Sequence, residues 1–409
     1  MKKEKSVFDA KVINLAEPSM TPLPYRSKDF EYRDFIPFGN DNLFPQALAL
    51  FARSSPNHRG VIDSKNVYFL GDGIQATDEK DKEVVSWLDN INFEKQNINE
   101  LQNKFFLDEI IFNNSYVEII TDAKRSFLWI NHIDSTKCRK SLDGKYIIMH
   151  PDWSQDTGKA DKKRKVYPIY PNFERIEDEK YAPLRSIYHK FDYEPEFTFY
   201  GIPKYISGRD SIMIDMKTNR WNLSRLKNAF SLSGIFLVPV KDNTESAKVL
   251  KYIDQNFKGE EKAGKLLTIT KSRAQDNEKA DRAQLIETKQ DNDGNWINLH
   301  KQSLSDIVIA HNWYRSLTGI ADNTGFDTQR ILNEYQVAQK TIISRAQKSW
   351  VDLYKRIAYE VQGKEIDITF KNSPPLNDFR YYKIWEIRQS KGLEFDENDP
   401  AQQEIIKTN

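Results

Sequence analysis

The sequence predicts an α+β protein in which a sheet-containing region is combined with long amphipathic helices. Two observations lead to this fold class. Short apolar runs separated by turn residues fill the segment from about 115 to 193, which indicates an antiparallel sheet that follows several helices. Three later segments repeat apolar residues every three or four positions, which is the spacing of one face of an α-helix. A smaller αβ unit lies between the first two of these helices.

Each element before residue 203 follows from a local signal. Asn40 or Asp41 can cap a first helix, and Pro56 lies in the first turn of a second. The apolar run 67–70 then predicts a buried strand, which the turn 71–73 closes. Further helices are predicted at about 79–88 and 97–112, and strands at 116–121, 127–132, 145–149 and 187–193.

The three long helices are predicted at about 209–233, 295–317 and 328–362. The third would be about 50 Å long at ~1.5 Å per residue, and helices of that length usually belong to a bundle, a coiled coil or a large assembly. Each apolar face needs a surface that covers it, and the family resemblance given below implies that identical copies supply part of that surface. The predicted subunit-interface residues are Leu304, Ile307, His311, Ile331, Tyr335, Ile342, Ala346 and Leu353. The stripe on the third helix also includes Ala338, Ser349, Ile357 and Val361.

Shorter elements complete the chain. Strands are predicted at 235–240, 266–270 and 285–288, with a helix from Thr244 to about Phe257, and these form the insert between the first two long helices. After the third helix, a strand at 366–370 precedes a last helix at 378–390. The first 37 residues have no clear periodicity and are expected to form an extended arm.

Composition excludes several classes of protein. The 61 basic and 60 acidic residues give a net charge of +1, which argues against a surface that binds nucleic acid as a whole. The single cysteine, Cys138, excludes an intrachain disulfide and a thiolate metal cluster, and it fits a reducing cytoplasm. No run approaches the roughly 18 apolar residues of a membrane-spanning helix, so no contact with a membrane is predicted.

No motif predicts catalysis convincingly. The segment 259–266 resembles a phosphate-binding P-loop, but Leu266 stands where a hydroxyl should hold magnesium, and the segment follows a helix and precedes a strand. Glu287 and Lys289, with Asp276 and Asp281 upstream, match a nuclease pattern that is common by chance. The six histidines are scattered without the spacing of a metal site. We therefore predict no catalytic residue, cofactor or metal.

The basic run 158–165 has two interpretations. An exposed, solvated loop is the simpler one, and contact with a phosphate backbone is the alternative.

Three stretches together resemble a known family. The first is Asn42-Leu43-Phe44-Pro45, followed by helices and the Gly-Asp-Gly turn. The second is Tyr200-Gly201-Ile202-Pro203, which leads into a long helix and the αβ insert. The third runs from Ile309 through Gly319 into a polar glycine loop and the third long helix. In this order and spacing, over roughly residues 38–390, the chain resembles the portal proteins of tailed bacteriophages and related head-tail particles.

The resemblance implies a division of the chain into the parts of a portal subunit. These parts are an N-terminal arm (1–37), a wing (38–203), a first stem helix (204–233), an αβ clip (234–292), a second stem helix (293–317), a tunnel loop (318–327), a long wing helix and strand (328–371), and a short helical crown with a tail (372–409). The segment after Gly363 is short, so a large crown is not expected.

The resemblance also implies a structural function. Such proteins form rings, usually of twelve subunits, at the unique capsid vertex, and double-stranded DNA passes through the ring during packaging and ejection. The partners would be the terminase large subunit, which carries the ATPase, a head-tail adaptor and the major capsid protein. The protein would be made in the bacterial host cytoplasm and end in the virion. Candidate DNA-channel residues are Arg220, Lys227, Lys301, Asp322, Asn323, Thr324 and Gly325.

Two other functions stay open at this point. One is a metal-dependent nuclease or nucleotide-using phage enzyme built on the Glu287 or Gly259 segments. The other is a different head-tail structural protein. A ring with a central hole would favour the portal, whereas a stable monomer with metal-dependent cleavage of DNA would favour the enzyme.

Overall fold

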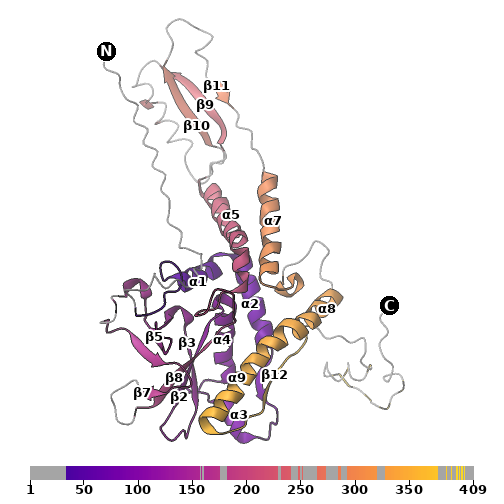
Figure 1. Cartoon of the computed structure of the whole chain (residues 1–409). Coiled ribbons are helices and arrows are strands. Elements are labelled where there is room, and N and C mark those ends of the chain that lie inside the picture. Colours follow the sequence, from indigo (N-terminus) through magenta and orange to yellow (C-terminus); the bar gives the residue numbers. More distant parts are fainter. Residues whose placement is uncertain are drawn as a thin grey trace. The chain divides into compact units, whose positions relative to one another are not determined.

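The computed structural model (Figure 1) describes most of the chain between residues 34 and 375. The described residues are 34–156, 158, 161–175, 182–228, 232–240, 247–248, 251, 265–272, 284–286, 293–319 and 328–375, with residues 384, 388, 393, 394, 396, 398 and 400. Two compact units divide the chain. The first comprises Met1–Ser54, His58–Ser207 and Val308–Asn409, and the second Ser55–Asn57 and Gly208–Ile307. Helices and sheets occur in both, which confirms the α+β class.

The helices that begin the chain are α1 (Phe44–Ser54), α2 (Pro56–Leu70), α3 (Lys82–Asp89) and α4 (Ile98–Phe112). Side chains cap two of them, as their sequences favour. Asp81 accepts from the N–H groups of Glu83 and Val84 at the start of α3, and Asn97 accepts from Asn99 N at the start of α4. Both caps satisfy backbone donors that a helix leaves open.

The predicted strand at 67–70 is wrong, because these residues form the last turn of α2. Val67 is 66% exposed while Phe69 is 5% exposed, so the run presents one apolar side chain inward and another to solvent. A run of four apolar residues does not distinguish a strand from a helix end. Gly71 ends the helix with a left-handed φ of 55° and donates to Val67 O. Strand β1 (Gly73–Ala76) follows directly.

Two antiparallel sheets form the middle of the first unit. One has the order β3-β2-β8-β7, from Trp129–Ile133, Ser115–Thr121, Leu184–Lys190 and Glu174–Arg175. The other has the order β4-β5-β6, from Cys138–Lys140, Tyr146–Met149 and Lys165–Pro168. Short 3-10 turns lie at Ser135–Lys137, Trp153–Gln155 and Lys204–Gly208 (η4). The strands predicted between 116 and 193 are therefore confirmed with small shifts at their ends.

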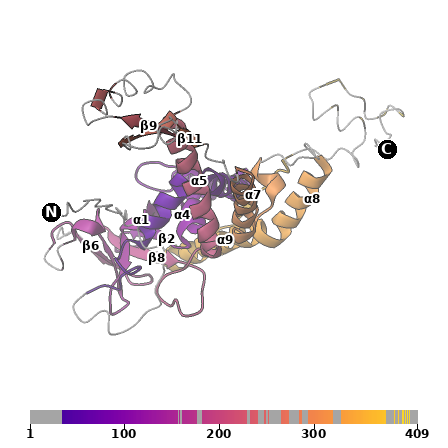
Figure 2. The ribbon, with the colours of Figure 1, turned by 90° about the horizontal axis from the view of Figure 1, so that it is seen from above.

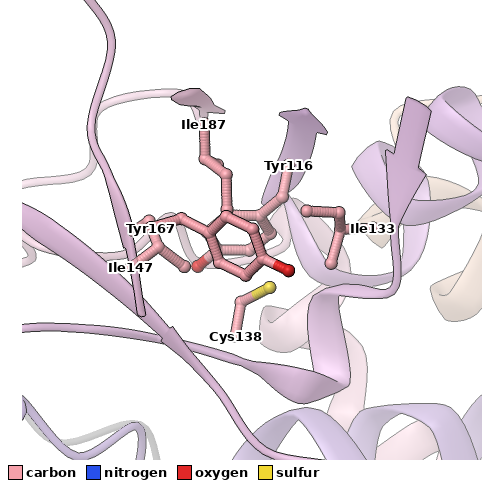
Figure 3. Close-up of a cluster of buried hydrophobic side chains, with 6 residues drawn as sticks. All are labelled: Tyr116, Ile133, Cys138, Ile147, Tyr167 and Ile187. Carbon is pink, nitrogen blue, oxygen red and sulfur yellow. The ribbon is translucent and has the colours of Figure 1, made fainter. Parts of the chain in front are cut away.

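Side chains from both sheets share one apolar cluster (Figure 3). Tyr116 and Ile187 come from the four-stranded sheet, and Cys138, Ile147 and Tyr167 from the three-stranded one. Burial raises the pKa of the Cys138 thiol well above its usual value, so this cysteine packs as a small apolar side chain and is not a reactive thiol.

A close backbone contact explains the glycine at position 201. A Cβ on this residue would lie 2.1 Å from the carbonyl oxygen of Asn113, so only glycine fits. Asn114 completes the contact, since its side chain donates to Gly201 O (2.8 Å) and accepts from Gly201 N (2.9 Å). The segment that leads from the sheets toward the next helix is thereby fixed to the end of α4.

The long C-terminal helix runs over the predicted range but contains a π-helical turn. Its parts are α8 (Thr328–Ala338), the π turn η6 (Gln339–Ile343) and α9 (Ser344–Gln362). A π turn adds one residue, and one residue rotates a helix face by about 100°. The predicted stripe holds before the turn at Tyr335 and Ala338, which are buried.

After the turn, the buried positions shift by one residue. The structure buries Ile343, Gln347 and Trp350, where the even periodicity predicts Ile342, Ala346 and Ser349. The stripe is again as predicted at Leu353, Ile357 and Val361, which are all buried.

Trp350 joins α9 to α4. Its ring is fully buried and stacks on Phe105 at 4.8 Å, and its Nε1 donates to an oxygen of Glu109 (2.7 Å). One turn later, Tyr354 donates to the side chain of Gln102 (2.7 Å). Strand β12 (Ile368–Lys371) follows α9 and pairs antiparallel with β1, so residues about 300 positions apart complete one sheet.

The second unit contains α5 (Arg209–Asn228), α7 (Asp293–Ala310) and a three-stranded sheet. In that sheet, β9 (Leu232–Val240) pairs parallel with β10 (Lys265–Ser272) and antiparallel with β11 (Gln284–Ile286). The strands predicted for the insert are confirmed.

The helix predicted to reach 317 ends at Ala310, because Asn312 has a left-handed φ of 49°. A 3-10 turn, Arg315–Thr318, follows. The expected arm before residue 34, most of the helix 244–257, nearly all of the tunnel loop and nearly all of the last helix lie outside the described residues.

We expect Trp350→Ala to reduce the free energy of unfolding by about 3–5 kcal/mol, because it removes a fully buried aromatic ring. The matched change Ser349→Ala, at an exposed position of the same helix, should stay within about 0.5 kcal/mol of the parent. Urea unfolding of both variants measures this. Equal effects of the two changes would contradict the shift of the buried face.

Candidate functional site

The helices α5 and α7 pair with each other, and they are the longest feature of the second unit (Figures 1 and 2). Ser211 Oγ lies 3.3 Å from Asp306, and His300 Nε2 lies 2.9 Å from Asp215. Along α5 from Ser211 to Asp215, the contacts on α7 move backward in the sequence from Asp306 to His300, so the two helices are antiparallel. This pair lies within the residue ranges that the resemblance to portal proteins assigned to two stem helices.

A buried carboxylate holds the pair together. Asp215, on α5, is fully buried and accepts from Ser55 Oγ (2.5 Å), Asn57 Nδ2 (2.7 Å) and His300 Nε2 (2.9 Å). Three donors therefore replace the water that the carboxylate loses, as a buried charge requires. The link joins α5, α7 and residues 55–57, so it fixes three distant segments of one unit.

The predicted DNA-channel residues are only partly within the described side chains. Arg220 on α5 and Lys301 on α7 are exposed, as a channel surface requires. The side chain of Lys227 and all of 322–325 lie outside the described part of the chain. The assignment of these residues to a DNA channel therefore stays a prediction.

Four of the eight predicted interface residues are buried within one chain. Ile307, His311, Tyr335 and Leu353 are exposed by only 0, 2, 7 and 5%. This corrects the expectation that identical copies are needed to cover these four. The other four, which a second copy can still contact, are only partly buried: Leu304, Ile331, Ile342 and Ala346.

His311 belongs to a buried aromatic cluster in the first unit. Its Nε2 lies 2.8 Å from Nδ1 of His58, so one ring donates and the other accepts. Tyr205 stacks on His311 at 4.8 Å and meets His58 edge-on at 4.5 Å. Burial lowers the pKa of His58 to about 3, and burial, then His58 and Lys65, lower the pKa of His311 well below its usual value.

The structure brings together one set of groups of the kind that bind metals. His150, Asp156 and Asp161 place ligand atoms within 4.8 Å of one another. Nδ1 of His150, however, accepts from the backbone N–H of Asp152 (3.0 Å), so the neutral ring carries its proton on Nε2, which faces Asp161. A metal would need that nitrogen deprotonated. Arg164 already binds both oxygens of Asp156. The groups therefore fit a structural cluster better than a metal site.

The motifs that suggested chemistry resolve as follows. The segments around Gly259 and Glu287 lie outside the described residues. In the basic run 158–165, Arg164 is not free for a phosphate backbone, because it pairs with Asp34 and Asp156 at 2.8 and 2.5 Å. None of the helices in the described ranges is long and apolar enough to cross a membrane.

No protein-family model matches the chain, and no curated protein matches it significantly. Solved structures match its fold.

A chain in the neck of an empty gene transfer agent (GTA) particle, computed with C6 symmetry, superposes with a TM-score of 0.54 at 12% identity, over 87% of this chain and 95% of that chain. A chain of the virion of a native GTA particle superposes with a TM-score of 0.52 at 12% identity, over 86% of this chain and 94% of that chain. A chain in the neck of a native GTA particle, computed with C12 symmetry, superposes with a TM-score of 0.51 at 13% identity, over 86% of this chain and 95% of that chain.

At this level of identity the similarity shows the fold, and it extends over nearly the whole of both chains. The mixed α+β fold of this chain is therefore the fold of a chain found in GTA necks.

We expect Asp215→Ala to destabilise the α5–α7 pair by about 2–5 kcal/mol, because it leaves buried donors without an acceptor. Hydrogen exchange of the α5 and α7 amides measures the loss locally. The control Asp210→Ala removes a carboxylate whose side chain is 82% exposed on the same helix and should change the exchange little. Unchanged protection in the Asp215 variant would show that the carboxylate does not hold the pair.

The buried histidines predict that stability falls in acid. The unfolded chain takes up a proton on each near pH 6.5, whereas the folded chain resists this, since burial lowers the pKa of His58 to about 3 and those of His189 and His311 well below their usual values. Stability that is present above pH 6.5 is therefore lost as the pH falls toward 3.

Each such histidine adds up to about 1.4 kcal/mol per pH unit to the slope of the free energy of unfolding against pH. Urea unfolding between pH 7 and 5 should show a shallower slope for His58→Gln than for the parent. A packing defect lowers the free energy of unfolding by the same amount at every pH, whereas loss of this titration changes its pH dependence. Equal pH dependence in the variant and the parent would count against a neutral buried His58.

Proposed function

We propose that the chain is a structural protein of the neck of a phage-like particle. The observation that carries this proposal is the fold similarity to chains of GTA necks and virions over 86–87% of this chain and 94–95% of those chains. Fold alone does not give function, because one fold can serve many functions. Here the match is not confined to a widespread small domain, since it covers 86–87% of this chain and 94–95% of the matched chains.

Within the neck, the finer proposal is that of a portal subunit. Residues 38–203 would form the wing, α5 and α7 the stem, the sheet between 234 and 292 the clip, and 318–327 the tunnel loop. Two of the similar structures were computed with C6 and C12 symmetry, which supports a ring of identical copies, twelve in the proposed portal. A ring closes when each subunit presents two different surfaces to its neighbours.

The proposed ring is a channel for double-stranded DNA at the unique capsid vertex, with no chemistry of its own. A channel through which DNA slides should not hold it tightly, because each fixed cation–phosphate pair adds to sequence-independent binding. The net charge of +1 fits this requirement. The partners would be the terminase large subunit, a head-tail adaptor and the major capsid protein, and a different head-tail structural role is the alternative outcome.

Electron microscopy of the purified protein, with native mass spectrometry, tests the proposal. We expect closed rings with a central hole and a single subunit number, twelve for a portal. Rings of another number, or stacked tubes, would favour another head-tail protein. A stable monomer at micromolar concentration, or metal-dependent cleavage of DNA, would contradict a ring-forming structural role.

The half-buried positions on the long helix give a sharper prediction. Ile342→Asp and Ala346→Glu should prevent ring assembly while the monomer keeps its circular dichroism spectrum, because both side chains are only partly buried in one chain. Lys348→Glu, at an exposed position on α9, is the control and should assemble. Rings of normal size from both interface variants would place the subunit contact on another face.

A further inference from the structure

A cavity of about 180 Å³ lies in the first unit beside the π turn of the long helix. Its walls come from α2, α4, the turn η4, the residues after α7 and the first turns of η6 and α9. A liquid water molecule takes up about 30 Å³, so the cavity has room for a group larger than one water. Nothing in the proposed neck function requires a cavity here.

Three cationic side chains line the cavity from three separate elements. They are Lys65 on α2, Lys204 on η4 and Arg345 on α9. Among the described residues, neither Lys65 nor Arg345 has a carboxylate within ion-pair distance. Lys65 Nζ donates to the backbone oxygen of His311 (2.9 Å), and two of its three N–H donors are left for another acceptor.

The two carboxylates in the walls do not neutralise these cations. Glu109 already pairs with Lys190 Nζ (2.9 Å) and accepts from Trp350 Nε1 (2.7 Å). Asp192 lies 3.8 Å from Lys204, and both side chains are more than half exposed, so this pair contributes little. Among the residues that the structure describes, the cavity walls therefore carry more positive than negative charge.

The pKa of the Lys65 ammonium shows that its charged form is destabilised in the cavity wall. Burial, and then the charge of Lys204, lower the pKa of Lys65 to about 8, while Glu109 acts weakly in the opposite direction. A lysine whose charged form is destabilised in this way gains from any anion that enters beside it. The aromatic rings of Phe69 and Trp313, 5.5 and 5.8 Å from Nζ, offer only cation–π contact.

The π turn contributes residues to the wall of the cavity. Thr341 and Ile342 lie in η6 and line the cavity, and Arg345 follows at the start of α9. In a regular helix the residues after the turn would point about 100° away, so the inserted residue turns the face that carries Arg345 toward the cavity. π turns inside α-helices are frequent at functional sites.

We propose that this cavity is a binding site for a single oxyanion, a phosphate or carboxylate group held by Lys65, Lys204 and Arg345. The oxyanion can come from free phosphate or from an acidic side chain of a second copy. The proposal does not depend on the neck function, because it concerns a charge imbalance within one chain.

Calorimetric titration of the full chain with inorganic phosphate tests the site, with ionic strength held constant by NaCl. We expect one saturable site per chain, and a loss of affinity of tenfold or more in Lys65→Met and in Arg345→Met. Arg345 is exposed, so its variant should fold even if the Lys65 variant does not. Lys348→Met removes the same charge from an exposed position of α9 outside the cavity and should bind like the parent.

The second source is tested on the assembled protein. If a carboxylate of a second copy fills the cavity, phosphate should shift native masses toward smaller assemblies in the parent but not in Arg345→Met. If assembly is indifferent to phosphate while the titration shows one site, the ligand is the free anion. Absence of saturable binding together with indifferent assembly, or equal binding by Arg345→Met and the parent, would overturn the proposal.

Discussion

The packing of α9 on α4 is the contact on which the first unit depends. Trp350 is central to it, since its ring is fully buried against Phe105 and its N–H donates to Glu109 (2.7 Å). The same carboxylate pairs with Lys190 at the end of β8, so one side chain of α4 connects the C-terminal helix to the sheet. The long helix is thus a structural part of the unit that the N-terminal half begins.

Local signals in the sequence predicted most elements, because capping and strand alternation act over a few residues. Asn97 and Asp81 cap helices where the sequence favours it. The shift of the buried face after Ala338 could not be predicted, because local periodicity carries no signal for the residue that the π turn inserts, and Trp350 packs against Phe105, which is far away in the chain. Periodicity alone assumes 3.6 residues per turn throughout, and it therefore chose Ser349 instead of Trp350.

The sequence predicted the two helices of the candidate site but not the contacts between them. Apolar periodicity indicated the two helices, but no pattern pointed to Asp215, whose partners are up to 160 residues away. Contacts between polar residues that are far apart in the chain produce no repeating pattern in the amino-acid sequence. The cavity beside the π turn is hidden for the same reason, since its cations come from α2, η4 and α9.

The pairing of β1 with β12 has a consequence for synthesis. Gly73 pairs with Lys371, so the ribosome must add about 300 residues after β1 before its partner strand exists. At roughly 5–20 residues per second this takes on the order of 15–60 s. For most of that interval α4 lacks the helix that covers Phe105, and the nascent chain exposes an apolar surface. We therefore expect its folding to be late, cooperative and dependent on protection by chaperones.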